Sequence, residues 1–398
     1  YIAGDLVIPN FFQINNINFS ANYKPDPTGY EDEIQSIFAS AELSWKNQLY
    51  LTVTGRNDWD SKLAFSKQKS FFYPSVGLSA LLSEMVKLPE VISYAKIRGS
   101  YTVVASSFDR FLTNPGYEYN SQTHNWANPT VYPMDNMKPE KTKSWEIGLN
   151  LKFWGNRFNL DATYYRSNTL NQTFKVDIPS SSGYKQAIVQ AGNVQNQGIE
   201  LALGVSDKWA GFGWSSNATF TLNRNKVKRL ASGSVNPVTG EAIQMDEMNV
   251  GWLGKENVAP RVILTEGGSM TDIYVYNQLT KDNNGNIKVD QNGNLGITSS
   301  NTPVKVGNLD ADFNLGWTNH FTYKGIDLGV VLSARVGGLA YSATQGILDY
   351  YGVSETSATA RDNGGIPINN GKVNAQKYYQ TIGTGEGGYG RYYLYSAT

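Results

Sequence analysis

The sequence predicts an all-β protein, a segment of an antiparallel up-and-down β-barrel that crosses a membrane. Three observations predict this fold class. Apolar and polar residues alternate with a period of two along about ten segments, as in strands that have one apolar face. Aromatic residues gather at the ends of these segments, where membrane strands carry interfacial girdles. Short and long connections alternate along the chain, which places all long loops at one end of the barrel.

The composition agrees with an all-β protein and excludes several other classes. Among 398 residues there are 25 Tyr, 16 Phe, 9 Trp and 39 Gly, with charged residues at only 17%. Lys+Arg and Asp+Glu are equal at 34 each, so the chain lacks the basic surplus typical of nucleic-acid binding. The absence of cysteine excludes disulfides, thiolate metal sites and a thiol nucleophile. Apolar runs long enough for a membrane-spanning helix are missing, and alternating strands keep mean hydropathy low, at -0.39.

The expected strands are justified by their alternation. In the first, Leu43 and Trp45 alternate with Glu42 and Ser44. The same pattern recurs in each later segment, at lengths close to those that cross a bilayer at a tilt. The expected strands cover about residues 39–45, 49–54, 76–82, 96–103, 145–153, 158–164, 199–205, 214–222, 313–323 and 326–336.

The connections between these strands fall into two classes. The short ones are 46–48, 83–93, 154–157, 207–212 and 324–325. The long ones, expected as outer loops, are about 58–71, 106–143, 169–197, 225–311 and the tail 338–398. The polar face of the strands could be exposed to bulk water or could line a water-filled lumen. The aromatic girdles at the strand ends and the alternation of connections favour the lumen.

The segment 225–311 is too long for a structureless loop and is expected to hold local structure. Ile273 to Tyr276 read as a short strand. Asn284-Gly285 and Asn292-Gly293 read as hairpin turns. The Asp282 and Asp290 segments lack the Gly and Glu positions of a calcium-binding loop, so we expect turns there and no metal site.

Eight segments, in order along the chain, resemble the central barrel of SusC/RagA-type TonB-dependent transporters. They are Thr-Gly-Arg-Asn-Asp-Trp (54–59), Phe-Tyr-Pro-Ser-Val (72–76), Lys-Ile-Arg-Gly-Ser-Tyr (96–101), Lys-Pro-Glu-Lys-Thr-Lys-Ser-Trp-Glu-Ile-Gly (138–148), Tyr-Tyr-Arg-Ser-Asn-Thr (164–169), Asn-Val-Gln-Asn-Gln-Gly-Ile-Glu (193–200), Phe-Thr-Tyr-Lys-Gly-Ile-Asp-Leu (321–328) and Arg-Val-Gly-Gly (335–338). Each segment is weak evidence alone, and the ordered series is specific.

The resemblance implies that residues 1–398 form part of one barrel domain of about 22 strands. It implies that the N-terminal plug, the TonB box and the closing strands lie outside this chain. It also implies the outer membrane of a Gram-negative, Bacteroides-type bacterium as the location. TonB–ExbB–ExbD would supply energy through the missing plug region. A SusD-like surface lipoprotein would cover the outer loops. Two such transporter–lipoprotein pairs could form a dimer.

The function that follows from the resemblance is TonB-dependent import of a nutrient oligomer, an oligosaccharide before an oligopeptide. A siderophore or cobalamin receptor is one alternative, and would show a different motif series. A glycan-binding β-sandwich without transport is another, and would bury its apolar face against a second sheet. The sequence shows no catalytic triad or carboxylate pair, and His124 and His320 lack partner ligands, so we expect neither an enzyme nor a cofactor.

Aromatic residues of the expected loops are the candidates for contact with substrate or with the lipoprotein. Their rings can stack on sugars or peptide side chains, although packing of loop against loop explains them as well. The candidates are Trp59, Tyr117, Tyr119, Trp126, Tyr132, Tyr350 and Tyr351. Most of the loop charges are expected to be solvated or paired locally, and one or two remain candidates for substrate contact; they are Asp58, Asp60, Asp109, Arg110 and Arg361.

Overall fold

The structure is a computed structural model of the chain. It describes residues 6, 8–10, 12, 16, 29–114, 116–120, 125–134, 137–178, 180–230, 240–241, 245 and 247–398.

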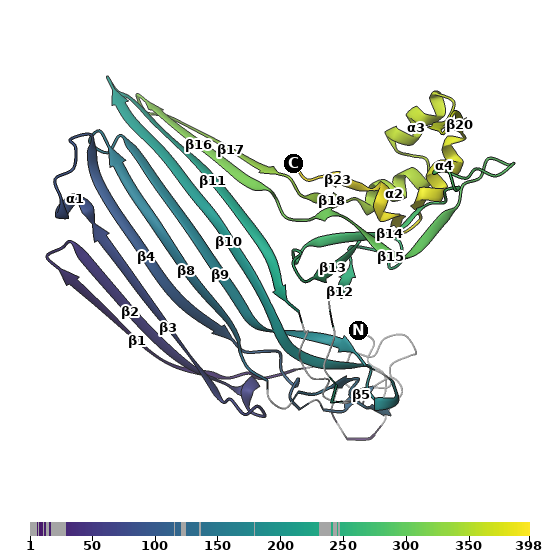
Figure 1. Ribbon diagram of the computed structural model, residues 1–398, viewed down its shortest axis with the longest axis horizontal. Helices are drawn as coiled ribbons and strands as arrows, with labels where there is room; N and C mark the ends of the chain where they lie inside the picture. The colour runs from purple at the N-terminus through teal and green to yellow at the C-terminus, as the bar shows by residue number, and fades with distance from the viewer. Residues whose placement is uncertain are drawn as a thin grey trace.

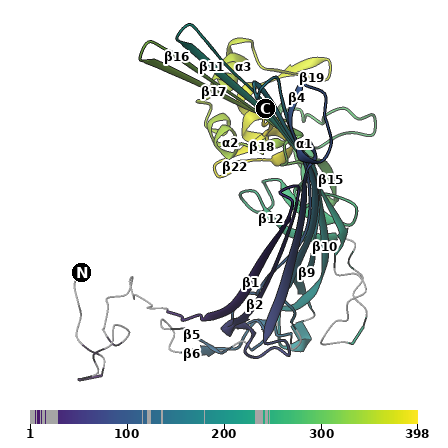
Figure 2. The ribbon, with the colours of Figure 1, turned by 90° about the vertical axis from the view of Figure 1, so that its left-hand side faces the viewer.

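Ten long antiparallel strands form a curved wall, and all ten coincide with the expected strands (Figures 1 and 2). Each strand pairs with its neighbour along the chain or with the next long strand, as in an up-and-down barrel. A short strand, β7 (Val131–Tyr132), joins β10 in parallel. Within the described residues the sheet ends at β1 and β17 without closing. The ten strands are β1 (Ile34–Trp45), β2 (Leu49–Asp60), β3 (Ser70–Leu81), β4 (Ile92–Ser106), β8 (Glu140–Phe153), β9 (Phe158–Asp177), β10 (Gln186–Trp209), β11 (Phe212–Arg229), β16 (Phe313–Tyr323) and β17 (Ile326–Val336).

The pairing register gathers the apolar residues of all ten strands on one face of the wall. Leu51 is opposite Leu43 in β1 and Leu78 in β3, and side chains of directly opposite residues share a face. These side chains are uncovered: Leu43 is 65% exposed and Leu203 is 55% exposed. A soluble sandwich would cover such a face with a second sheet. The wall therefore has the apolar outer band expected of a membrane barrel.

Aromatic side chains form a belt at the short-turn end of the wall, as expected. Trp154 and Phe158 lie edge to face with ring centroids 5.3 Å apart. The ring centroids of Phe212 in β11 and Phe321 in the adjacent β16 are 6.3 Å apart. The ammonium of Lys324 lies 5.2 Å from the Tyr323 ring, so a cation marks the watery side of this belt.

The expected alternation of short and long connections holds only in part. At one end of the wall, tight turns join β1 to β2, β8 to β9, β10 to β11 and β16 to β17, and the small helix α1 (Leu82–Met85) joins β3 to β4. The turn at Lys324 and Gly325 has φ values of 44° and 87°, the left-handed pair that a two-residue hairpin with native twist requires. The long connections between β4 and β8 and between β11 and β16 lie at the opposite end, but those after β2 and β9 are no longer than the one that contains α1.

One expected loop is wrong: most of 169–197 is strand. β9 continues to Asp177 and β10 begins at Gln186, leaving only a short loop with the 3-10 turn η3 (Ser180–Ser182). Register shifts on either side of Gly192 interrupt the pairing. The extended ends of β9 and β10 bury Phe174, Val189 and other apolar residues against neighbouring loops. The alternating pattern of a lipid-facing strand does not predict these strand ends, because their side chains do not face lipid. The expected loop at 58–71 is also shorter, because β2 runs to Asp60 and β3 starts at Ser70, with η2 (Ser61–Leu63) between them.

The long segment between β11 and β16 holds local structure, as expected. It contains a four-stranded sheet of β12 (Glu247–Trp252), β13 (Arg261–Thr265), β14 (Asp272–Leu279) and β15 (Ile297–Asn308). The predicted strand at Ile273 is part of β14. Gly285 and Gly293 adopt φ of 86° and 76°, which confirms the two turns. Between β4 and β8, the hairpin β5 (Glu118–Asn120) and β6 (Asn125–Ala127) forms.

The tail after β17 is not a loop, which corrects the expectation for 338–398. Three short helices occur: α2 (Ala343–Tyr350), α3 (Glu355–Asp362) and α4 (Ala375–Ile382). Ser342, Ser354 and Asn374 cap their N-termini through side-chain oxygens, a local signal that strand periodicity does not reveal. Small ladders and the turn η4 (Gly390–Tyr392) connect the helices. The ladders pair β18 (Leu339–Tyr341) with β23 (Leu394–Ser396), β19 (Ile366–Ile368) with β20 (Gly371–Val373), and β21 (Gly383–Thr384) with β22 (Gly387–Gly388).

The tail packs on the four-stranded sheet, and together they make one body, here called the outer domain (residues 247–308 and 338–398; Figure 1). Leu279 from β14 shares a buried cluster with Ile382 and Tyr393 from the tail. The Tyr392 hydroxyl accepts a hydrogen bond from the Leu279 amide at 2.6 Å. Two chain segments separated by β16 and β17 thus form a common core.

Candidate functional site

The polar face of the wall carries charges that are paired across strands. The guanidinium of Arg98 in β4 donates to the Asp161 carboxylate of β9 at 3.1 Å and to the Thr163 hydroxyl at 2.6 Å. Asn150 of β8 donates to the same carboxylate at 2.9 Å. A Cβ at Gly148 would lie 2.6 Å from Arg98 Cζ, so the guanidinium lies flat across this glycine. The result is a polar, hydrogen-bonded surface on the lumen side.

A second polar group lies nearer the long-loop end of the wall. Arg56 donates to Asp58 at 2.7 Å and to Ser36 at 2.9 Å, and the Tyr73 hydroxyl donates to Asp58 at 2.6 Å. These side chains come from β1, β2 and β3. The polar face is therefore continuous across neighbouring strands, as a water-filled passage requires.

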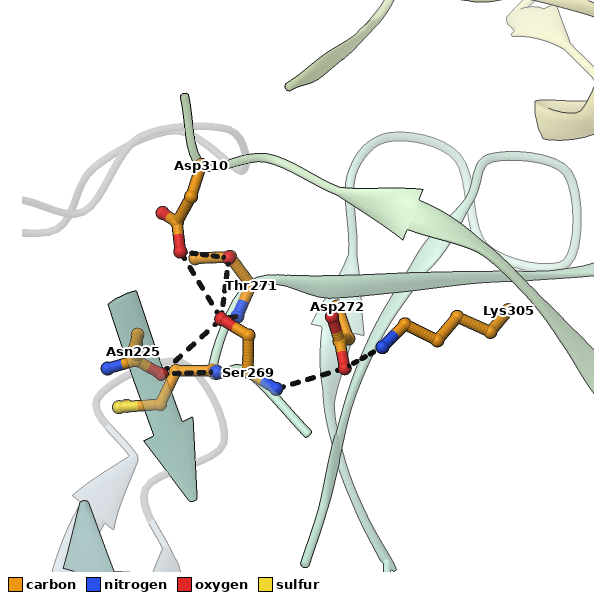
Figure 3. A network of polar contacts seen from close by, with 7 residues as sticks. Asn225, Ser269, Thr271, Asp272, Lys305 and Asp310 are labelled. Carbon is orange, nitrogen blue, oxygen red and sulfur yellow. Dashed lines mark hydrogen bonds and ion pairs between the residues drawn. The ribbon is translucent and has the colours of Figure 1, made fainter. Parts of the chain in front are cut away.

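A polar network joins the wall to the outer domain, as Figure 3 shows. The Asn225 side-chain oxygen, near the end of β11, accepts from the Met270 amide at 2.8 Å and from the Ser269 hydroxyl at 3.3 Å. The Asp310 carboxylate accepts from the hydroxyls of Ser269 at 3.2 Å and Thr271 at 2.7 Å. These four side chains, from Asn225, Ser269, Thr271 and Asp310, are called the junction network below. It fixes the start of β14 to the wall.

Beside the junction network lies a buried carboxylate. Asp272 is 1% exposed and is paired with the ammonium of Lys305 on the adjacent strand (Figure 3). The Ser269 amide donates to the same carboxylate oxygen at 3.0 Å. Removing one member of such a pair leaves an uncompensated buried charge, which is costly. We assign this pair to the stability of the outer domain.

A cavity of about 270 Å³ opens between the three helices of the outer domain and is called the tyrosine pocket. Its floor holds Asp349 and Ser357, both buried. Around it lie Tyr350, Tyr351 and Gly352 after α2, Arg361 from α3, and Ala375, Gln376, Tyr379 and Gln380 from α4. Burial, with the nearby Asp349 charge, raises the pKa of the Tyr379 phenol above its ordinary value.

The structure brings two of the candidate aromatic residues together in this pocket. The rings of Tyr350 and Tyr351 meet edge to face at 5.1 Å. Sequence reasoning missed Gln376, Tyr379 and Gln380, and it placed Arg361 among five loop charges without choosing which of them contacts substrate. The cap residue Asn374, followed by two glutamines four residues apart, is the signal that could have placed them on one helix face.

The other candidates lie elsewhere. Tyr117 is exposed and lines a cavity of about 460 Å³ with Arg110 and Val131. Trp126 in β6 is exposed and is paired with Tyr119 of β5, whose side chain lies outside the described residues.

Tyr132 and Trp59 do not face the lumen as open contact surfaces. The Tyr132 ring packs edge to face on Tyr184 at 5.1 Å, against the buried cluster around Val189. Trp59 falls on the same face of β2 as Leu51, which is the apolar face of the wall. Both are explained by packing or by the lipid interface.

In the described part of the chain, no group of three or more His, Asp or Glu side chains could hold a metal ion. His320 is paired with Asp327 across β16 and β17, and His124 lies outside the described residues. A search of the described residues finds no helix with the length and apolar character needed to cross a membrane.

Comparison with known proteins assigns the family. The family model "TonB dependent receptor-like, beta-barrel" matches residues 7–255. The TonB-dependent receptor P3 of Formosa agariphila is 25% identical over 344 residues, covering 78% of this chain and 33% of that protein. The TonB-dependent receptor SusC of Bacteroides thetaiotaomicron is 25% identical over 353 residues, covering 82% of this chain and 34% of that protein. The chain thus spans about a third of the length of these curated relatives, which are receptors and not enzymes.

Solved structures agree on the fold. The RagAB peptide importer in its 'closed-closed' state matches with a TM-score of 0.67 at 16% identity, covering 92% of this chain and 39% of that one. The 'open-open' state matches with a TM-score of 0.59 at 17% identity, covering 81% and 35%. With the ordered motifs, the uncovered apolar face and the polar wall, these matches confirm the expected resemblance. The chain belongs to the TonB-dependent receptor-like β-barrel family of the outer membrane.

Proposed function

We propose that this chain supplies part of the barrel wall and of the outer mouth of an importer of nutrient oligomers. The observation that carries the proposal is the two-faced wall: uncovered apolar side chains such as Leu203 on one side and paired charges such as Arg98 and Asp161 on the other. A wall of this kind separates lipid from an aqueous passage. The junction network holds the outer domain against the wall, and this domain would add binding surface for the cargo.

The whole transporter would take energy from TonB–ExbB–ExbD through a plug and would work with a SusD-like surface lipoprotein. Its likeness to SusC and to the RagAB peptide importer supports this arrangement. We favour an oligosaccharide over an oligopeptide as cargo, because the tyrosine pocket offers aromatic rings and neutral amides. The assembly of two transporter–lipoprotein pairs is part of the same proposal.

Uptake by cells tests the proposal. The gene for the full-length protein is deleted and then restored, and cells are supplied in turn with oligosaccharides, oligopeptides and ferric siderophores as the sole source of the nutrient. We expect growth on an oligosaccharide to need both this gene and TonB, and the protein to copurify with a surface lipoprotein from outer membranes. Loss of siderophore uptake alone, or recovery of the protein in the soluble fraction, would overturn the proposal.

A further inference from the structure

We propose that the tyrosine pocket binds one pyranose unit of an oligosaccharide. This inference rests on the proposed function and names the site at which the outer domain would meet the cargo. The pocket is formed by α2, α3 and α4, and its lining comes from three separate stretches of the tail.

The floor of the pocket is held rigid before any ligand arrives. Asp349, only 4% exposed, accepts hydrogen bonds from Thr356 at 2.8 Å and Gln345 at 2.9 Å, and another from the Ser354 hydroxyl. Ser354 also caps α3 through the Ser357 amide at 3.0 Å. These three donors all bind one oxygen of the carboxylate, Oδ1, and hold it in place on the floor. Rigid sites lose less entropy on binding.

The rim of the pocket offers an aromatic surface. Tyr351 is 65% exposed, and its ring stands edge to face against Tyr350. Tyr379 closes the opposite side from α4, with its hydroxyl 3.5 Å from the Thr356 carbonyl. An exposed aromatic ring beside polar groups suits the mixed apolar and hydroxylated faces of a sugar ring.

Polar groups complete the recognition surface. Gln376 and Gln380 are exposed, lie four residues apart on α4 and so share a face of the helix. The structure gives neither amide a hydrogen-bond partner within the described residues. Each can donate and accept, as sugar hydroxyls do. Arg361 donates one N–H to the Gly352 carbonyl at 2.8 Å, and its guanidinium has further donors.

Size and charge favour a sugar unit over a peptide. At about 270 Å³, the cavity lies just below the range of roughly 300–1,000 Å³ that holds drug-sized ligands, so it fits one ring and not a whole oligomer. The lining contains a cation and two exposed amides, while its carboxylate, Asp349, is almost wholly buried. A neutral or acidic sugar ring meets these donors, whereas the ammonium of a basic peptide would have to reach a carboxylate that is only 4% exposed.

A local spectroscopic readout tests the inference in the full-length transporter in detergent. The protein is labelled with 3-fluorotyrosine, and the Tyr351 resonance is assigned by its loss in Tyr351→Phe. Maltohexaose, an oligogalacturonate and an alanine hexapeptide are titrated separately. We expect a saturable shift of the Tyr351 resonance with a glycan, no shift with the peptide, and no shift at Tyr323, an exposed tyrosine of the wall.

Substitutions separate recognition from folding. The double variant Gln376→Ala/Gln380→Ala should weaken glycan binding at least about tenfold, because it removes the free donors and acceptors and leaves the core intact. Arg361→Gln should weaken only the acidic glycan. Gln291→Ala, at an exposed glutamine of the same domain outside the pocket lining, serves as the matched control and should bind as the parent does. If the double variant binds as tightly as the parent, the inference is wrong.

The outcomes also distinguish this inference from the proposed function. Glycan import without a shift at Tyr351 would overturn the pocket assignment and leave the importer intact. A shift at Tyr351 in a protein that imports no glycan would retain the pocket and overturn the oligosaccharide as cargo. An equal shift with the hexapeptide would overturn the sugar specificity argued above.

Discussion

At the scale of single residues, the two faces of a strand make opposite demands on side chains. Leu203 points to the apolar face, about six residues from the aromatic belt at Trp209. At roughly 3.3 Å per residue and a tilt of about 40°, this places it ~15 Å from the belt, near the middle of the bilayer. Ala202, its neighbour, lies on the lumen face opposite Thr219.

Leu203→Arg should therefore destabilise the barrel by about 2–4 kcal/mol, because the guanidinium would sit in lipid. Urea-dependent refolding of the full-length protein into vesicles measures this change. Ala202→Arg is the matched control and should cost far less, since its side chain enters water. Equal costs for the two variants would contradict the assignment of the faces.

The residue scale also shows what sequence could and could not predict. Leu43, Leu51 and Leu78 belong to strands that the sequence predicts, because a strand facing lipid has an apolar residue at every second position. Gln190 and Asn193 also lie in a strand, but in the part of β10 outside the membrane, where alternating apolar residues are not required. The choice of Tyr350 and Tyr351 came from residue type alone, whereas Tyr379 needed knowledge of how α4 packs.

At the scale of elements, the β19–β20 hairpin depends on one glycine. Gly365, just before β19, has φ of +115°, and a Cβ there would lie 2.3 Å from the Val373 carbonyl. Gly365→Ala should cost about 1–3 kcal/mol through backbone strain and steric conflict. Thermal unfolding followed by limited proteolysis of the outer domain measures the loss.

Gly371 in the same hairpin provides the control. A Cβ at this position meets nothing within 4 Å. Gly371→Ala should stay within about 0.5 kcal/mol of the parent. If both variants lose stability alike, glycine content and not the geometry of Gly365 would be responsible.

The helices of the tail depend on buried tyrosines, which gives the outer domain a pH dependence. Burial raises the pKa of the Tyr341, Tyr378, Tyr392 and Tyr393 phenols above the ordinary value. In the unfolded chain these phenols ionise near pH ~10, while in the folded domain they stay neutral to higher pH. The stabilisation is therefore complete below about pH 10 and is lost as the pH rises further.

Absorbance at 295 nm during a titration with base measures this behaviour. We expect exposed phenols to ionise first and the buried ones to ionise together with unfolding of the outer domain. Smooth ionisation of all tyrosines near pH ~10, with the domain still folded, would contradict the role of burial.

Sequence patterns predicted the elements unequally. Ten wall strands were predicted because each repeats a simple two-residue pattern. The helices α2, α3 and α4 were not, because each has only eight residues and depends on tertiary packing, as α4 does through Ile382 in the core shared with β14. That core joins segments far apart in the chain, a fact that no local pattern contains.

At the scale of the whole molecule, the junction network decides how firmly the outer domain is held to the wall. Asn225→Ala removes the acceptor for the Met270 amide and the Ser269 hydroxyl. We expect hydrogen exchange at residues 267–272 to become about tenfold faster, since a lost hydrogen bond of this kind costs ~1–3 kcal/mol. Mass spectrometry of exchange in the full-length protein measures this rate.

Asn223→Ala is the control for this change. Asn223 lies two residues earlier on β11 and contacts Tyr165 and Asn196, which belong to the wall. Its loss should leave exchange at 267–272 unchanged. Faster exchange in both variants would show that the wall itself had loosened and would contradict a specific role for Asn225.

The division of the outer domain into two chain segments has a consequence for biogenesis. Residues 247–308 precede β16 and β17, and residues 338–398 follow them, so the shared core at Leu279 and Tyr393 joins parts that flank a hairpin crossing the bilayer. The core can close only after both parts have been exported on the same side of the membrane. An antibody that recognises the closed domain would therefore report, on living cells, that this hairpin has finished its insertion.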